Sequence, residues 1–123
     1  MNGKKVVLVG WNPEIVDFSK WPGLTKEKLL RVLEDDRDKL RSLGYEADIL
    51  FIQDAESAYD TVINALNETT YDCVQIGAGV RTIEEHFIVF EKLVNAVHQG
   101  APNAKICFNT NPSDTAESVQ RWI

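Results

Sequence analysis

The stretch Lys4-Lys5-Val6-Val7-Leu8-Val9-Gly10 decides the fold. Its four consecutive apolar residues are typical of a strand that is buried on both faces, and such strands lie in the middle of parallel sheets. Parallel neighbours cannot be joined by a tight turn and need a crossover connection, which is usually a helix. The rest of the chain is therefore expected to alternate helices with strands.

The chain outside this stretch shows that alternation. Apolar runs predict strands at residues 47–52, 73–76 and 105–108, and helical spacing predicts helices at residues 25–44, 54–66 and 82–99, with a last helix from Ser113 or Asp114 onward. Thr25 and Gly44 are the expected start and stop of the first helix. Thr82 and Glu85 form a T-x-x-E pattern that predicts a capping box at the start of the third helix.

Four successive strand and helix units imply right-handed crossovers and one parallel sheet. We expect a single α/β domain spanning residues 1–123, with three layers and four strands in the flavodoxin-like order 2-1-3-4. In that order the direction of winding reverses between the first and third strands, and ligands bind in the crevice at this point.

Composition excludes several classes of function. Hydrophobic residues make up 44% and charged residues 26% of the 123 residues, as in ordinary globular domains. The net charge of -6 argues against a nucleic-acid partner, because phosphate binding needs clustered basic residues. No apolar run approaches the roughly 18 residues that span a bilayer, and no secretory signal is present, so we expect a cytoplasmic protein without membrane partners.

The loops at the rim of the expected crevice hold the candidate ligand-binding residues. These residues are Asn12, Gly77, Gly79, Arg81, Asn109 and Asn111. Glycines let a backbone approach a ligand closely, and arginine presents a rigid fork of donors, so a small anion is the expected ligand. The alternative is structural: the glycines permit a tight turn, Arg81 pairs with a neighbouring carboxylate, and Asn111 caps a helix.

Catalysis is less well supported by the sequence. Residues 77–82, Gly-Ala-Gly-Val-Arg-Thr, resemble part of a dinucleotide fingerprint, but Thr82 replaces its third glycine and no cofactor is predicted. His86 lies near the start of the expected third helix and is a weak candidate for a general acid or base. It has no evident partner, so the sequence leaves open whether the protein is an enzyme.

Acidic and sulfur-containing residues have simple structural interpretations. Asp35, Asp36 and Asp38 alternate with basic residues, which is typical of a solvated helix face, and no metal site is predicted. Cys73 and Cys107 fall within buried strands and are expected to be small core residues.

Three aromatic residues occupy the long loop after the first strand. Trp11, Phe18 and Trp21 are expected to close over a ligand, to form a local core, or to meet a second subunit, and the sequence does not choose among these. The first helix alone covers one face of the sheet unless the short C-terminal helix with Trp122 folds back beside it, and in either arrangement that face is thinly covered. We therefore expect a homodimer through this region.

Two resemblances bear on function. Residues 71–76, Tyr-Asp-Cys-Val-Gln-Ile, resemble the third strand of response-regulator receiver domains, but Gly77 stands at the phosphoacceptor position and Gly10 and Trp11 at the acidic pair. The resemblance therefore implies a shared strand order without phosphotransfer. Residues 77–87 and 107–112 are similar to a group of small bacterial single-domain proteins with no assigned activity, which implies a bacterial source.

These patterns favour small-molecule or anion binding at the crevice between the first and third strands. The alternative is a protein-interaction or homo-oligomeric assembly module without catalysis.

Overall fold

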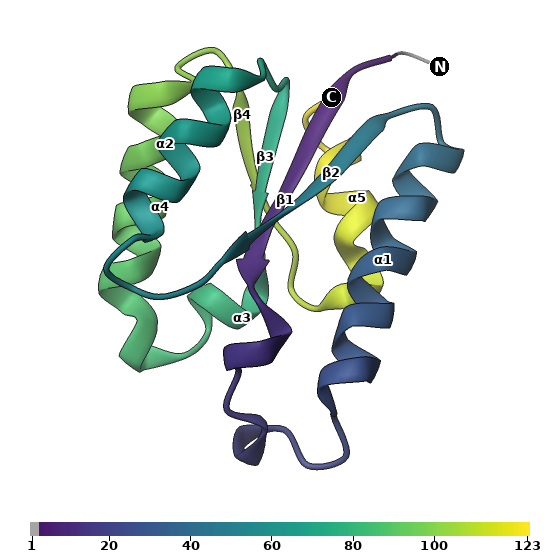
Figure 1. Cartoon of the computed structure of the whole chain (residues 1–123). Coiled ribbons are helices and arrows are strands. Elements are labelled where there is room, and N and C mark those ends of the chain that lie inside the picture. The colour runs from purple at the N-terminus through teal and green to yellow at the C-terminus, as the bar shows by residue number, and fades with distance from the viewer. Residues whose placement is uncertain (1–2) are drawn as a thin grey trace.

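Four parallel strands form the centre of the molecule. The computed structural model describes residues 3–123, apart from the side chains of Lys20 and Pro112. Its sheet consists of β1 (Lys5–Trp11), β2 (Glu46–Ile52), β3 (Cys73–Ile76) and β4 (Lys105–Phe108). They lie in the order β2-β1-β3-β4, and all three neighbouring pairs are parallel (Figure 1). The predicted order 2-1-3-4 is confirmed.

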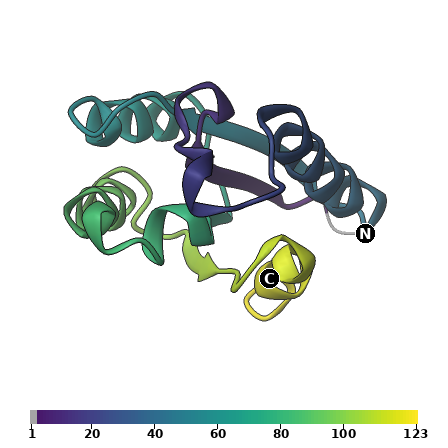
Figure 2. The same cartoon turned by 90° about the horizontal axis from the view of Figure 1, so that it is seen from below.

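Helices cover both faces of this sheet, so the three-layer prediction is also confirmed. The helices α2 (Ala58–Glu68) and α4 (Phe87–Gly100) pack side by side on one face. On the other face lie α1 (Lys26–Ser42) and α5 (Thr115–Gln120), as the view along the strands shows (Figure 2). Short helical turns occupy the connections: η1 (Pro13–Ile15), η2 (Phe18–Lys20), α3 (Ala78–Arg81), η3 (Glu84–His86) and η4 (Pro112–Asp114).

The alternation of side chains along β1 builds two hydrophobic cores. Val7 and Val9 belong to the core beneath α2 and α4, whereas Val6 and Leu8 belong to the core beneath α1 and α5. All four side chains are buried, which explains why the strand reads as a continuous apolar run.

The first helix begins and ends where the sequence predicts. Thr25 Oγ1 accepts a hydrogen bond of 3.2 Å from the backbone N–H of Lys28. Gly44 has a φ of +99°, a left-handed conformation that glycine adopts without a steric penalty. Both signals lie at the ends of the helix itself, so the sequence alone locates where α1 begins and ends.

The start of the third predicted helix is wrong. The Thr82 hydroxyl donates to the carbonyl of Ala78 instead of capping a helix, and α4 begins only at Phe87. An earlier turn, α3, forms directly after β3, because its first N–H group is capped by Asn109 at 3.0 Å. A side chain from the end of another strand thus overrides the local capping pattern.

The C-terminal helix folds back beside α1, which is one of the two arrangements that the sequence leaves open. Ala116 and Val119 of α5 are buried against the sheet, while Trp122 stays 54% exposed.

Among helices of residues 3–123, none is long and apolar enough to cross a membrane.

Candidate functional site

A cavity of about 370 Å³ lies at the carboxyl ends of β1 and β3, where the sheet changes its direction of winding. We call it the crevice cavity. It extends from the loops at this edge to the sheet face beneath α1. Its wall is mostly apolar and includes Leu8, Trp21, Leu29, Leu33, Ile49 and Phe51. Its position agrees with the crevice at which ligands bind in open α/β sheets.

Four of the six predicted ligand-binding residues line this cavity. Gly77, Gly79, Asn109 and Asn111 do so, whereas Asn12 and Arg81 are not among its lining residues. Asn111 also caps η4 through the N–H of Ser113, as the structural alternative predicted. A role of these residues in ligand binding stays a prediction.

The two residues outside the cavity make contacts within the protein. Asn12 accepts a hydrogen bond from the N–H of Glu14 and donates one of 2.9 Å to Gln53. Arg81 donates to the carbonyl of Ile76, and its guanidinium lies 5.1 Å from the ring centre of Phe108. These contacts explain both side chains without a ligand.

The weak catalytic candidate, His86, also lies outside the crevice cavity. It directly precedes α4, and its ring centre is 4.9 Å from that of Trp11. Trp11 itself lines the cavity, so His86 contacts a lining residue without lining the cavity. The geometry places no catalytic partner on His86 among the described residues.

Trp11, which the sequence places in the loop, is the last residue of β1, and together with the long loop that follows it closes one end of the cavity. Trp11, Val16, Trp21 and Leu24 line it, while Phe18 is half-buried outside the lining. Trp11 also packs against the core beneath α2 and α4. Two of the three predicted aromatics therefore stand where a ligand would meet them.

Asn109 connects three segments at the inner end of the cavity. Its side chain is 6% exposed. Its Oδ1 accepts from the N–H of Ala78 at 3.0 Å and from Arg81 at 3.5 Å, and its Nδ2 donates to Thr115 Oγ1 at 2.9 Å. This residue therefore joins the end of β4 to α3 and α5. Its side chain also occupies the N–H group of Ala78, which an anion bound at this turn would need.

Asp36 is a cavity residue, which corrects the prediction that all three aspartates of α1 form a solvated face. Its Oδ2 accepts a hydrogen bond of 2.8 Å from the Thr115 hydroxyl, and its carboxyl group lines the cavity. Burial raises the pKa of Asp36 from 3.8 to about 6. Perturbed carboxyl groups facing a cavity are more frequent at functional sites than elsewhere.

Two buried donors of the lining lack partners. Gln75 is 2% exposed, and its Nε2 makes no hydrogen bond to any residue from 3 to 123. The same holds for Nε1 of Trp11 within the described chain. An unpaired buried donor costs about 1–3 kcal/mol, so each such group in a folded protein needs a physical reason.

Gly10 leaves part of the cavity open. It lines the cavity on the same sheet face as Leu8, because alternate strand residues share a face. A Cβ atom placed on Gly10 would meet no atom within 4 Å, and its φ is not positive. Neither the backbone nor the immediate surroundings therefore require a glycine here.

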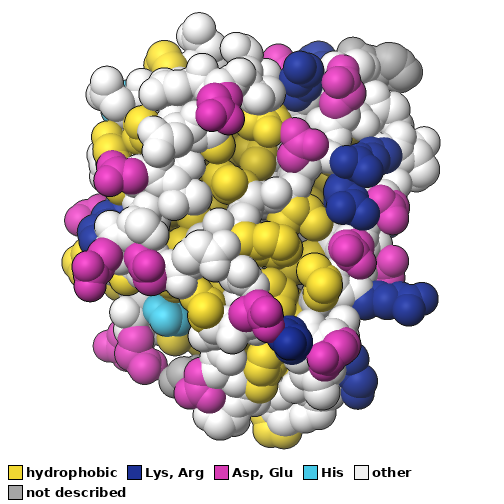
Figure 3. Space-filling view, in the orientation of Figure 1, with side chains coloured by type: hydrophobic (Ala, Val, Ile, Leu, Met, Phe, Trp, Pro, Cys, Tyr) yellow, Lys and Arg dark blue, Asp and Glu magenta, His cyan; other side chains and the backbone are white. Residues whose placement is uncertain are grey.

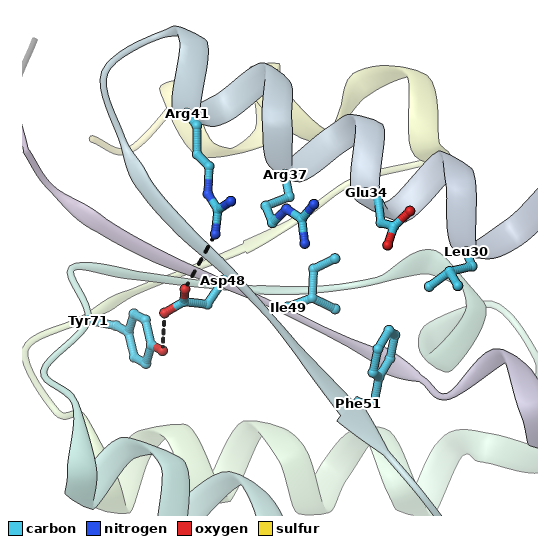
Figure 4. Close-up of a pocket in the computed structure, with 8 residues that line it drawn as sticks. All are labelled: Leu30, Glu34, Arg37, Arg41, Asp48, Ile49, Phe51 and Tyr71. Atoms are coloured by element: carbon cyan, nitrogen blue, oxygen red, sulfur yellow. Dashed lines mark hydrogen bonds and ion pairs between the residues drawn. The ribbon is translucent and has the colours of Figure 1, made fainter.

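A second hollow of about 400 Å³ runs along the outer edge of β2 (Figure 4). Hydrophobic side chains gather over this edge, between α1 and α2 (Figure 3). Three of its polar groups contact one another: Tyr71 donates to Asp48 at 2.7 Å, and Arg41 lies 3.9 Å from the same carboxylate. Because this edge groove holds no unpaired buried group in the described chain, it is the weaker candidate.

The cysteines are core residues, as predicted. Cys73 and Cys107 are buried beneath α5, and their Sγ atoms lie 3.3 Å apart. Neither lines a described cavity. Across residues 3–123, no group of three or more His, Cys, Asp or Glu side chains is placed to hold a metal ion.

Comparison with known proteins does not supply a function. No family model matches the chain. A search of curated proteins found no match either. The resemblance to a bacterial group stays a prediction, and function has to be inferred from the cavity, because a fold by itself does not determine activity.

Sequence reasoning missed Gln75, Asp36 and Thr115. A signal existed for two of them. Gln75 interrupts an otherwise apolar strand, and Asp36 shares helical spacing with Leu33 and Leu40, which places it on the inner face of α1. Thr115 has no such signal, because its contact with Asp36 depends on how α5 folds back.

Proposed function

We propose that the protein binds a small, predominantly apolar molecule in the crevice cavity. The observation that carries this proposal is the pairing of an apolar cavity with convergent polar groups at the switch point of the sheet. Ligand sites have volumes of about 300–1,000 Å³, apolar walls and a few placed polar groups. The crevice cavity has all three properties.

Residues that reduce stability support the proposal. Gly10 weakens β1 at a position where a larger residue would fit. The carboxyl group of Asp36 is half-buried, which disfavours its ionised form in the folded protein. Natural sequences keep such costs mainly at sites that serve function.

The test uses a neutral fluorescent probe, 6-propionyl-2-(dimethylamino)naphthalene, titrated into the protein. We expect saturable binding with a blue-shifted emission. At ten times the dissociation constant the probe should add about 1.4 kcal/mol to the free energy of unfolding. That gain corresponds to roughly 5 °C in melting temperature for a domain of this size.

Gly10→Val is the decisive variant. Its side chain enters the cavity without a backbone conflict, so the unliganded variant should melt at or above the wild-type temperature while losing probe binding. Thr70→Val, at an exposed position outside the cavity lining, is the matched control and should bind like wild type. Equal binding by wild type and Gly10→Val would refute the proposal.

A second candidate function is assembly of two copies. Trp122 is 54% exposed beside α5, and β4 has a strand neighbour on one side within the described sheet. Large exposed aromatics near an open sheet edge favour association. Light scattering at tens of micromolar should give twice the monomer mass and Trp122→Ser should halve it, whereas a monomer mass for wild type would remove this candidate.

The cytoplasmic location, the bacterial source and the absence of nucleic-acid partners remain predictions from the sequence. Fractionation of the source cells tests the first of them directly.

A further inference from the structure

We propose that the occupant of the crevice cavity is an uncharged apolar molecule bearing a carbonyl-type oxygen, which accepts hydrogen bonds from the side chains of Gln75 and Trp11. This inference rests on the proposed function, because it names the chemistry of the molecule bound there. It follows from the kinds of polar group that line the cavity and from those that do not.

The unpaired groups are both donors. Nε2 of Gln75 belongs to a side chain that is 98% buried in the central strand β3, and it has no partner among residues 3–123. Indole Nε1 of Trp11 can only donate, and it too is buried and unpaired within the described chain. A ligand that pairs with these groups has to present acceptor oxygens, and an apolar molecule lacking them would leave both donors unsatisfied.

The charge of the lining argues for a neutral ligand. Among the described residues that line the cavity, none is Lys, Arg or His, and Asp36 is the one ionisable side chain. A carboxylate or phosphate would lose its hydration without gaining a counter-ion, and it would face the Asp36 carboxyl. Arg81, the basic residue predicted for an anion, does not line the cavity. It donates to the carbonyl of Ile76 and, at 3.5 Å, to the Oδ1 of Asn109, and its guanidinium packs over Phe108.

The remaining lining is apolar on several sides. Leu29 and Leu33 come from α1, Ile49 and Phe51 from β2, and Trp21 from the loop after β1. These apolar side chains are suited to contact a hydrocarbon or aromatic part of the ligand, next to its carbonyl group. Selectivity is therefore expected to arise from the donors at Gln75 and Trp11, since apolar walls discriminate weakly between molecules of similar shape.

The test compares three molecules of one shape: the propionyl naphthalene probe, its 6-propyl analogue with CH₂ in place of the carbonyl, and 6-(dimethylamino)-2-naphthoate as the anion. Dissociation constants are measured by calorimetry for the wild type. We expect the propionyl probe to bind about tenfold more tightly than the propyl analogue, which corresponds to one or two net hydrogen bonds. Simple partition into an apolar site would favour the propyl analogue instead.

Two variants locate the preference. Gln75→Met keeps the length of the side chain and removes its donor, and Trp11→Phe keeps an aromatic ring and removes Nε1. Each should reduce the preference for the carbonyl several-fold, and the double variant should bring it to about one. Gln75→Met should melt close to wild type, because the Nε2 group that it removes has no partner among the described residues. Trp11→Phe should melt at a lower temperature, because its smaller ring loses contacts with the core and with His86.

The outcomes separate this inference from the proposed function. If all three molecules bind equally and Gly10→Val blocks them, the cavity is a ligand site but the carbonyl preference is refuted. Tightest binding of the naphthoate would overturn the neutral-ligand inference in favour of an anion. If no molecule binds, or if Gly10→Val binds as wild type does, the proposed function itself fails.

Discussion

The Thr115 hydroxyl donates a hydrogen bond of 2.8 Å to Oδ2 of Asp36, and this bond joins the last helix to the first across 79 residues of sequence. Asn109 donates in turn to Thr115 Oγ1 at 2.9 Å. The inner end of the crevice cavity is therefore held by a short chain of hydrogen bonds. Its two outer members, Asp36 and Asn109, each give a testable prediction.

Asp36→Asn should stabilise the protein at pH 7.5. The folded pKa of about 6 exceeds the ordinary 3.8, so the folded state disfavours ionisation, and stability falls as pH rises from about 4 through 6. Asn keeps an oxygen for Thr115 and removes the charge. The gain should be about 1 kcal/mol, because solvent screens a half-exposed carboxyl group.

Urea denaturation at pH 7.5 and pH 4.0 checks this prediction. The gain should nearly vanish at pH 4.0, where the folded wild-type carboxyl is mostly protonated. Asp38→Asn, at an exposed position on the same helix, should change stability by less than about 0.5 kcal/mol at either pH. A gain of equal size at both pH values would show that the raised pKa of Asp36 is not the cause of the gain.

Asn109→Ala should destabilise the protein by about 2–3 kcal/mol. It removes the cap from the Ala78 N–H and the donor to Thr115, both near the buried end of β4. The denaturation midpoint should fall, and the Ala78 amide should exchange faster with solvent. Asn67→Ala, an exposed change in α2, serves as the control, and equal effects of the two changes would show that Asn109 is not a structural link.

Tyr71→Phe should cost about 1 kcal/mol at pH 7, because it removes the hydrogen bond of 2.7 Å to Asp48 at the edge groove. Burial and this bond raise the pKa of Tyr71 to about 12. Tyr71 therefore favours the folded state below pH 10, and this contribution is lost as pH rises through 12.

Ultraviolet titration of tyrosinate follows the same group. One phenol should ionise near pH 12 in the folded protein and be missing in Tyr71→Phe. Tyr59→Phe should keep that late transition. If the late ionisation were present in both Tyr71→Phe and Tyr59→Phe, it would belong to another tyrosine.

The two thiols should react slowly with a disulfide reagent in the native protein. Cys73 and Cys107 are buried beneath α5. The hydrogen-bond contact with Cys107 raises the pKa of the Cys73 thiol, and burial raises it further. Val119→Ala should speed the reaction by loosening α5, whereas Val94→Ala on the opposite face should affect it less. Rapid native reaction of either thiol would contradict the packing of α5.

Most of the fold follows from local patterns. The apolar run of β1, the cap at Thr25 and the left-handed Gly44 each act over a few residues, so the sequence contains them directly. The start of α4 does not follow from such a local pattern. Asn109, in the turn after β4, accepts a hydrogen bond from the N–H of Ala78, and a short helical turn forms there, ahead of the predicted helix start. Such a cap requires the strand register to be known.

The candidate site was predictable in place but not in chemistry. The strand order locates the crevice, and Gly77 and Asn109 lie in it as expected. The predicted basic group does not line it, because Arg81 packs over Phe108 instead. Part of the polar character of the cavity comes from Asp36, whose charged neighbours along the sequence conceal that it faces inward.

The open backbone at Gly10 also makes the cavity adjustable in size. Replacing Gly10 by Ala, Val and Leu adds volume stepwise from a regular strand position into the same space. The resulting series is a molecular ruler: the substitution at which each compound ceases to bind measures how deeply that compound reaches toward β1. Compounds of graded length can thus be ranked by depth of insertion without a structure of any complex.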